Sequence, residues 1–308
     1  MQGGGVMPSI GLQQLGAHTV HVKYEGNNNP SGSRAPLIDP AMLTWLRAFF
    51  SGAPFQAKAI PEPLWQTTLQ QYAFLADRPV AEQQQLRRLT SQFLAEKEFS
   101  GAHGLVVSDA MAVAVAAQAC LPVLHWGTAG LRFYDDFKGI VIHPGAMLAR
   151  REVTDAIGVV HRYSEVLAGE AMQGGPVTLS WQDVAEGGEL AGQGYNVVIH
   201  EFVHKIDMHS SAGSEPNGCP PLPSRAARTR WHAVMQPAYD AFKSRVVMAE
   251  RFGGEHPWLD GYGATSPAEF FAVACEAYFV NRMRFEQEFA ELTALFDAFF
   301  KPQSTQAQ

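Results

Sequence analysis

Two histidines and a glutamate occur at a spacing that can bind and use a metal ion. The segment from Tyr195 to Asp207 contains His200, Glu201 and His204 in the pattern His-Glu-x-x-His. On a helix, residues i and i+4 lie on one face about 6 Å apart, so both imidazoles can reach one ion while the glutamate projects beside them. The pattern favours zinc, which brings the pKa of bound water to about 7, and the carboxylate can then act as general base and acid.

Composition and context both support this interpretation over a coincidence. A chain with 11 histidines among 308 residues would contain the pattern by chance about 0.02 times. The residues around it are apolar, as in a buried helix that carries a site: Val197, Val198, Ile199, Phe202, Val203 and Ile206. The alternative is that the two histidines are ordinary core or surface residues of a helix.

A catalytic zinc needs a third protein ligand, which different superfamilies take from different places. A metzincin would have glycine at position 207 and histidine at position 210, where this chain has Asp207 and Ser210. His209 has the wrong helical phase for the same face unless the helix has already ended. The third ligand is therefore expected further along the chain.

The stretch from Asp260 to Glu276 offers two carboxylates at the start of a second helix. Ser266 as N-cap, Pro267 in the first helical position and Glu269 three residues after the cap form a capping box. A capping box would also explain the glutamate at position 269 without any metal. Glu276 lies two turns further along the same face, roughly 10 Å away, so the two glutamates cannot easily share one ion.

The chain resembles the Mlc titration factor A family (MtfA-like zinc peptidases), which is related to the catalytic domain of the lethal-factor toxin. The resemblance covers roughly residues 60–300 and is carried by four stretches: Gln66 to Asp77 with the helix through Phe93 to Lys97, Val177 to Asp183, Tyr195 to Asp207, and Tyr262 to Phe279. The last two motifs are the most specific ones.

The resemblance implies a role for several residues of this chain. It implies Glu269 as the third zinc ligand and Tyr262, seven residues earlier, as a group that supports the reaction. A phenol near the scissile carbonyl can donate a hydrogen bond to the oxyanion as it forms. Glu276 is then expected to hold a histidine from outside the ligand set, and Asp207 is a second candidate for such a role, with a plain helix-end polar residue as the alternative.

Hydrophobic periodicity and helix-breaking residues predict the helices and strands that position these side chains. Helices are expected over 42–50, 80–99 and 109–121, the last capped by Ser108 and buried on nearly every face. Strands are expected over 139–143, 157–166 and 176–181, because each is rich in β-branched residues. The four glycines within 186–194 predict a loop that leads into the helix beginning near Asn196.

Charge and composition exclude several other functions. The hydrophobic fraction of 46% and the charged fraction of 17% predict a globular protein with a sizeable core. A formal charge of −7, with basic residues only in short clusters, argues against direct nucleic-acid binding.

The three cysteines are odd in number and far apart, which argues against a disulfide scaffold. No secretory signal is recognisable, and the most apolar run, 110–124, is too short to cross a membrane. We therefore expect a soluble, cytoplasmic protein.

Together these observations predict an α+β fold of the gluzincin type, with a small sheet packed on helices that include the His-Glu-x-x-His helix. We expect a Gly/Pro/Asn-rich arm over residues 1–40 outside the core, a zinc metallopeptidase domain over 41–300 and a polar tail over 301–308. The resemblance implies an aminopeptidase-like activity on short peptides, with Zn²⁺ as cofactor, and binding of the Mlc transcriptional repressor. The alternative is a module that sequesters a repressor and whose zinc site is structural or vestigial.

Overall fold

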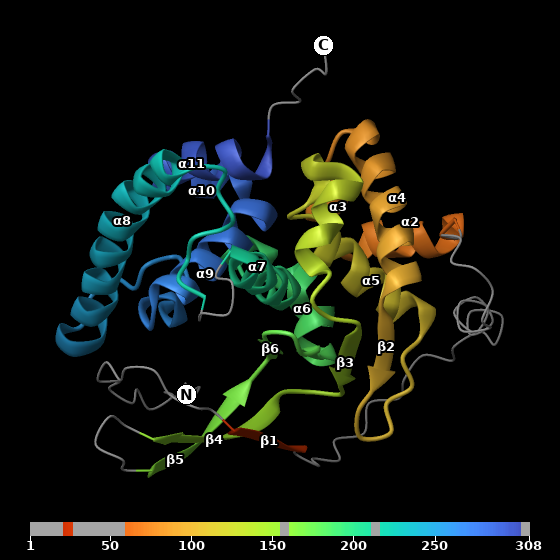
Figure 1. Ribbon diagram of the computed structural model, residues 1–308, viewed down its shortest axis with the longest axis horizontal. Helices are drawn as coiled ribbons and strands as arrows, with labels where there is room; N and C mark the ends of the chain where they lie inside the picture. The colour runs from red at the N-terminus through yellow and green to blue at the C-terminus, as the bar shows by residue number, and fades with distance from the viewer. Residues whose placement is uncertain (1–20, 27–58, 155–159, 211–215, 303–308) are drawn as a thin grey trace, which may run out of the picture.

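The computed structural model describes residues 21–26, 59–154, 160–210 and 216–302, and Figure 1 shows their helices gathered on one side of two small sheets. The helix predicted over 42–50, most of the arm over 1–40 and most of the tail lie outside the described residues. The helical elements are α2 (Glu62–Gln71), α3 (Ala73–Ala76), α4 (Val80–Glu96), α5 (Asp109–Cys120), η1 (Leu124–Tyr134), α6 (Trp181–Leu190), η2 (Ala191–Gln193), α7 (Val197–Ser210), α8 (Arg225–Phe252), η3 (Gly261–Ala264), α9 (Pro267–Val280), α10 (Arg282–Glu288) and α11 (Ala290–Phe300). The strands are β1 (His21–Gly26), β2 (Glu98–Gly101), β3 (Gly139–His143), β4 (Met147–Thr154), β5 (Val160–Leu167), β6 (Gly169–Ala171) and β7 (Val177–Ser180).

A mixed four-stranded sheet packs against the helices in the order β2-β3-β7-β6. β2, β3 and β7 run parallel, and β6 is an edge strand antiparallel to β7. In β3 the alternate residues Ile140 and Ile142 are fully buried, whereas all four residues of the central strand β7 are buried, as expected where a strand is covered on both faces. The predicted strands over 139–143 and 176–181 are confirmed, and so is the α+β class.

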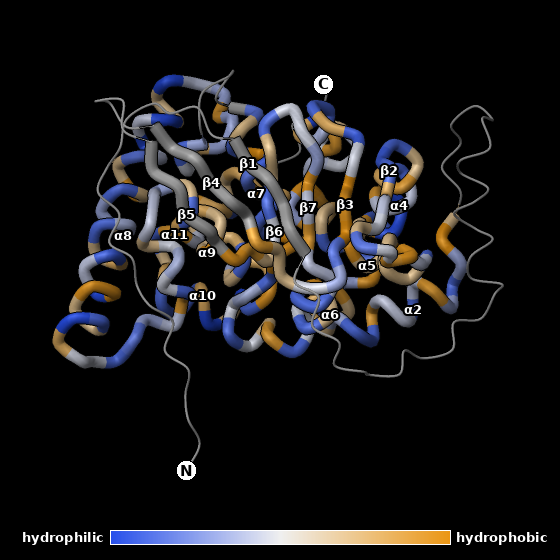
Figure 2. Tube along the Cα trace, turned by 90° about the horizontal axis from the view of Figure 1, so that it is seen from below, coloured by the Kyte–Doolittle hydropathy of each residue, from blue (hydrophilic) through white to orange (hydrophobic). Residues whose placement is uncertain are grey.

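A second, antiparallel sheet has the order β1-β4-β5. β5 occupies most of the strand predicted over 157–166, whose first three residues lie outside the described part of the chain. β4 was not predicted. Figure 2 shows the strands of both sheets on one face of the molecule, with the helices behind them.

The predicted helices over 80–99 and 109–121 are confirmed as α4 and α5. The side chain of Ser108 accepts a hydrogen bond from the Met111 amide, and α5 is buried along nearly its whole length. A helix with no polar face belongs in the interior, as its sequence indicates.

The prediction of a loop over 186–194 is wrong, because most of that segment is helical. The hydroxyl of Ser180 accepts a hydrogen bond from the Asp183 amide and begins α6, which continues through two glycines. At Gly188 a Cβ atom would lie 2.1 Å from the carbonyl oxygen of Gln71. Glycine is needed there because another backbone approaches closely, which outweighs its weak helix propensity. The turn comes later, at Gly194, where φ is +80°.

Two aromatic clusters hold the helices that matter for the site. On α7, Phe202 packs edge-on against Phe93 of α4 and Tyr134 of η1, with ring centroids 5.6 and 5.1 Å away. On α9, Phe271 packs against Trp231 of α8 and Phe296 of α11 at 5.5 and 5.7 Å. Such large buried rings contribute much of a core's stability, so α7 and α9 are rigidly placed.

Among the described residues, no single helix is both long and apolar enough to cross a membrane. α5 and η1 reach that length only as a pair, and they are bent by 107° relative to each other.

Candidate metal centre

His200 and His204 lie one turn apart on the same face of α7. Asn196 begins this helix, because its side-chain oxygen accepts a hydrogen bond from the Ile199 amide at 2.9 Å. The two imidazole Nε2 atoms are 3.1 Å apart, and the rings are nearly perpendicular with centroids 4.7 Å apart. The i, i+4 spacing therefore brings both ring nitrogens to one point, as the sequence predicts.

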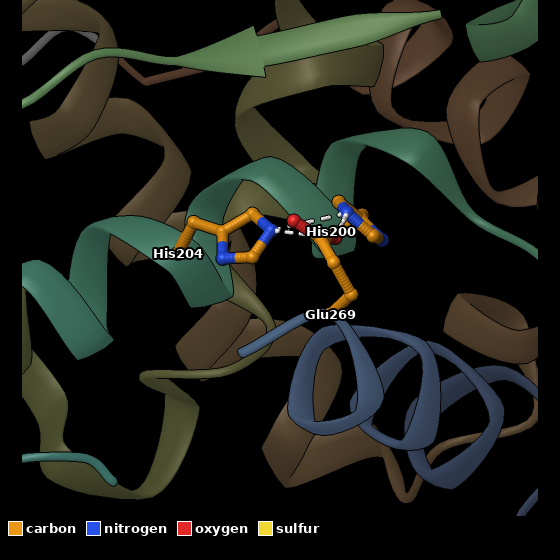
Figure 3. Close-up of side chains that lie close together, drawn as sticks. All are labelled: His200, His204 and Glu269. Atoms are coloured by element: carbon orange, nitrogen blue, oxygen red, sulfur yellow. Dashed lines mark hydrogen bonds and ion pairs between the residues drawn. The ribbon is translucent and has the colours of Figure 1, made fainter. Parts of the chain in front are cut away.

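Glu269 reaches the same point from α9. Its Oε2 atom is 3.0 Å from Nε2 of His200 and 3.2 Å from Nε2 of His204. Figure 3 shows the three side chains pointing toward one another from the two helices. The predicted capping box forms only in part: the Ser266 hydroxyl accepts a hydrogen bond from the Glu269 amide, while the Glu269 carboxylate turns to the histidines.

The three donors fit a metal ion in number, type and charge. One ligand atom from each of His200, His204 and Glu269 lies within 4.8 Å of the others. Two imidazole nitrogens and a carboxylate oxygen are a ligand set that catalytic zinc sites use, with a further position left for water or substrate. The two ring nitrogens face each other at 3.1 Å, so either a shared hydrogen or a metal ion between them would avoid repulsion of their lone pairs.

The directions of the pKa shifts in the cluster are also consistent with a metal site. Burial by itself lowers the pKa of His200, but hydrogen bonds to Glu269 and Glu276 outweigh burial and hold that pKa well above its usual value. Burial likewise raises the pKa of Glu269, and the two imidazoles outweigh it and hold the pKa well below the usual range. The cluster therefore favours a cationic charge beside an ionised carboxylate, which a divalent ion also provides.

Glu276 contacts the opposite side of the His200 ring. Its Oε1 atom is 2.8 Å from Nδ1 of His200, and its Oε2 atom accepts a hydrogen bond from the Asn196 amide. With only 2% of its surface exposed, Glu276 is fixed in place. As a carboxylate it accepts the Nδ1 hydrogen, which in the neutral ring leaves the Nε2 lone pair of His200 directed at the cluster.

Asp207 lies in the last turn of the same helix, three residues after His204. Its carboxylate accepts hydrogen bonds from the Gly218 and Cys219 amides at 2.6 and 3.3 Å. The Nδ1 atom of His204 is buried and makes no hydrogen bond within the described residues. These contacts tie the end of α7 to the segment that leads into α8.

Glu201 is buried beside the histidines, with 5% of its surface exposed. Burial disfavours its charged form and raises its pKa to about 7, although the neighbouring histidines partly oppose this. A Cβ atom at Gly169 of β6 would lie 2.6 Å from Oε1 of Glu201. The edge strand thus approaches this carboxylate so closely that any side chain at position 169 would displace Glu201.

Tyr262 lies on the open side of the cluster. It belongs to η3, where the Asp260 carboxylate accepts a hydrogen bond from the Tyr262 amide at 2.9 Å. Its ring centroid is 6.1 Å from that of His200, and 42% of its surface is exposed. The side chain is therefore within reach of a molecule that approaches the histidines from solvent.

The start of the helix near Asn196 was predicted and is confirmed. Two residues of this neighbourhood were not singled out from the sequence: Gly169 and Lys205. Gly169 and Lys205 carry no comparable local signal, since their partners are distant in the chain.

Comparisons with known proteins agree with this site. The model of the family described as glucose-regulated metallo-peptidase M90 matches residues 46–301. The curated proteins named Mlc titration factor A from Yersinia pestis (strain Pestoides F) and from Yersinia pseudotuberculosis (serotype O:1b, strain IP 31758) are each 32% identical over 220 residues, which is 71% of this chain and 77% of each relative. The resemblance inferred from the motifs is confirmed: the chain belongs to the glucose-regulated metallo-peptidase M90 family.

Proposed function

We propose that this protein is a zinc-dependent peptidase of the gluzincin type, with His200, His204 and Glu269 as the zinc ligands. The observation that carries the proposal is the convergence of these three donor atoms from two separately anchored helices, with the buried carboxylate of Glu201 next to them. Membership of a metallopeptidase family supports the same chemistry.

When bound, zinc supplies the Lewis acidity that polarises a water molecule and the carbonyl group of the substrate. Glu201 then removes a proton from the attacking water and passes it to the nitrogen of the leaving amine. Tyr262 donates a hydrogen bond from its hydroxyl to the oxyanion. Glu276 keeps His200 in the tautomer that directs its Nε2 lone pair toward the ligand position.

The edge strand β6 supports a peptide as the substrate. The Ala168 carbonyl accepts a hydrogen bond from the Ser180 amide, and the Met172 amide donates to the Pro176 carbonyl. Residues that bond to the neighbouring strand alternate with residues that do not in an antiparallel pair, so the backbone groups of Gly169 and Ala171 point to the other edge. Within the described residues no other strand pairs with that edge. An extended peptide can add to such an edge through main-chain hydrogen bonds, and Gly169 would place it next to Glu201.

Aminopeptidase-like specificity is the finer part of the proposal, and it rests on the family resemblance. The test is hydrolysis of matched hexapeptides with free and acetylated amino termini by the purified, zinc-loaded chain. Release of single residues from the free peptides alone is expected. Internal cleavage of both sets would make the protein an endopeptidase, and zinc binding without hydrolysis of either would favour the binding module.

A Mlc-type repressor is the proposed protein partner, supported by the names of the relatives. A cytoplasmic location is part of this proposal, because a transcriptional repressor acts where the DNA is. The rival hypothesis is a repressor-sequestering module whose zinc is structural or vestigial. The complete set of ligands with Glu201 and Tyr262 beside it favours catalysis.

Replacing Tyr262 by phenylalanine distinguishes these two roles. Tyr262→Phe removes one hydroxyl and retains the ring, and we expect turnover to fall by about a hundredfold to a thousandfold, the usual effect of losing an oxyanion donor. Zinc content and repressor affinity should not change, since the proposed role places the hydroxyl at the oxyanion and assigns it neither zinc binding nor contact with the repressor. Steady-state kinetics, metal analysis and repressor binding measure the three quantities.

Tyr239→Phe is the matched control, because its hydroxyl donates to the Ala264 carbonyl of the same η3 element. It should leave turnover nearly unchanged. Equal losses in the two variants would mean that disturbance of η3 explains the effect. A Tyr262→Phe protein with unaltered turnover would remove Tyr262 from the reaction.

A further inference from the structure

A buried lysine connects the proposed active-site helix to the turn of the β6–β7 hairpin. Lys205 directly follows His204 on α7, and its side chain is fully buried. Its ammonium group donates to the carbonyl oxygens of Met172 and Gly175, at 2.6 and 3.2 Å, and to the Asp136 carboxylate at 2.7 Å. All three hydrogens of the ammonium group therefore have an acceptor, as a buried charge requires.

Asp136 bonds to the same turn directly. Its Oδ2 atom, which accepts from Lys205, also accepts from the Gly174 amide at 3.1 Å. Gly174 has a φ of +63°, a conformation that glycine adopts without strain. The turn is closed by a hydrogen bond from the Gly175 amide to the Met172 carbonyl at 3.1 Å. Lys205, Asp136 and the turn over 172–175 thus form one connected unit, the hairpin clamp.

The clamp sets how far β6 lies from α7. β6 is only three residues long, so its pairing with β7 provides few hydrogen bonds of its own. At one end of the strand, Gly169 contacts the Glu201 carboxylate. At the other end, Lys205 holds the turn, and it lies one residue after His204 and one helical turn after Glu201 on the same helix. The turn after the strand is thus hydrogen-bonded to the helix that carries the ligands, and the start of the strand packs closely against the same helix.

Stability alone is a weak explanation for burying the charge of Lys205, whose partner Asp136 is partly exposed. Apolar residues of similar volume can often replace buried charged groups without loss of stability, whereas fixing a register is the best-attested use of a buried charge. The position next to His204 and the carbonyl acceptors in the hairpin turn fit that second use.

We propose that Lys205 and Asp136 are positioning residues, which hold the free edge of β6 beside Glu201 so that an extended peptide backbone can bind there. This inference rests on the proposed peptidase function. It assigns no contact with the reacting atoms to either residue, because both act through the strand.

Asp136→Ala is the main test, since 33% of the Asp136 side chain is exposed and its loss should leave the core intact. The exposed neighbour Asp135 provides the matched control, Asp135→Ala. For a free hexapeptide we expect Asp136→Ala to raise KM about tenfold, the equivalent of one or two backbone hydrogen bonds, with kcat little changed. For a single aminoacyl anilide, which cannot pair along the strand, both constants should stay at the level of the unaltered protein.

Two further variants sharpen this test. Asp136→Asn keeps an oxygen acceptor for the ammonium group and should recover much of the KM. Lys205→Met keeps the packing volume and should raise the hexapeptide KM at least as much as Asp136→Ala does. An equal KM change for both substrates, or the same change in Asp135→Ala, would overturn the inference.

Hydrogen exchange separates this inference from the function on which it rests. Amides 172–175 should exchange about tenfold faster in Asp136→Ala than in Asp135→Ala, because the turn opens more often. Unchanged exchange would overturn the clamp even if the protein is a peptidase. If the unaltered protein hydrolyses no peptide, the peptidase function is contradicted, and with it the substrate role of the strand, while faster exchange would still establish the clamp.

Discussion

The Glu201→Gln variant is expected to bind zinc and fold normally while turnover falls by a factor of about 10² to 10⁴, the usual contribution of a general acid–base group. The substitution conserves volume, so the close contact with Gly169 and the buried environment are retained. It removes the group that takes the proton of water and returns it to the leaving amine. Steady-state kinetics and metal analysis of the purified variant measure the two effects separately.

His200→Ala is the comparison variant for this experiment. That variant removes a proposed ligand and should lose zinc and activity together. If Glu201→Gln loses zinc as completely as His200→Ala does, then Glu201 binds the metal and its proposed role is wrong.

The second large effect concerns the two glutamates of α9. Glu269→Ala should abolish stoichiometric zinc binding, because Glu269 supplies one of the three donor atoms that converge. The helix itself should persist, since its cap is the hydrogen bond from the backbone amide of residue 269 to the Ser266 hydroxyl. Circular dichroism checks the fold, and titration against a chelator of known affinity measures the metal.

Glu276→Ala should weaken zinc binding only by about tenfold to a hundredfold, the usual cost of removing a partner that orients a ligand. Glu276→Gln retains an oxygen that can accept the hydrogen on Nδ1 of His200, and its affinity should lie between that of Glu276→Ala and that of the unaltered protein. The reverse order, with Glu276→Ala losing more affinity than Glu269→Ala, would exchange the two roles.

The histidine helix was predictable because its signals are local. The spacing of His200 and His204 needs only an α-helix to bring the rings together, and the apolar residues around them ensure that the helix is buried. Ser266 and Pro267 predict the start of α9 in the same way. Local sequence did not decide between Glu269 and Glu276, because that depends on how α9 packs across α7. The structure brings Glu269 to the Nε2 side of His200 and Glu276 to the Nδ1 side.

Where the sequence interpretation failed, contacts between distant segments decide the structure. Glycines 187 and 188 look like a loop, yet they stay in a helix because other segments pack closely against them. α8 was not predicted, and it continues through Pro237 within its 28 residues. The clamp at Lys205 joins groups 30 to 69 residues apart in the chain. A three-residue strand such as β6 has no periodicity from which it could be recognised.

Zinc titration of the metal-free protein, with hydrolysis of a free hexapeptide as the readout, tests the central claim most directly. We predict that activity is absent without zinc and rises in proportion to added zinc until one equivalent is bound. The Glu201→Gln protein should bind the same single equivalent and remain almost inactive. Hydrolysis that does not depend on zinc, or full activity in zinc-loaded Glu201→Gln, would contradict the assignment of this centre as a zinc peptidase site.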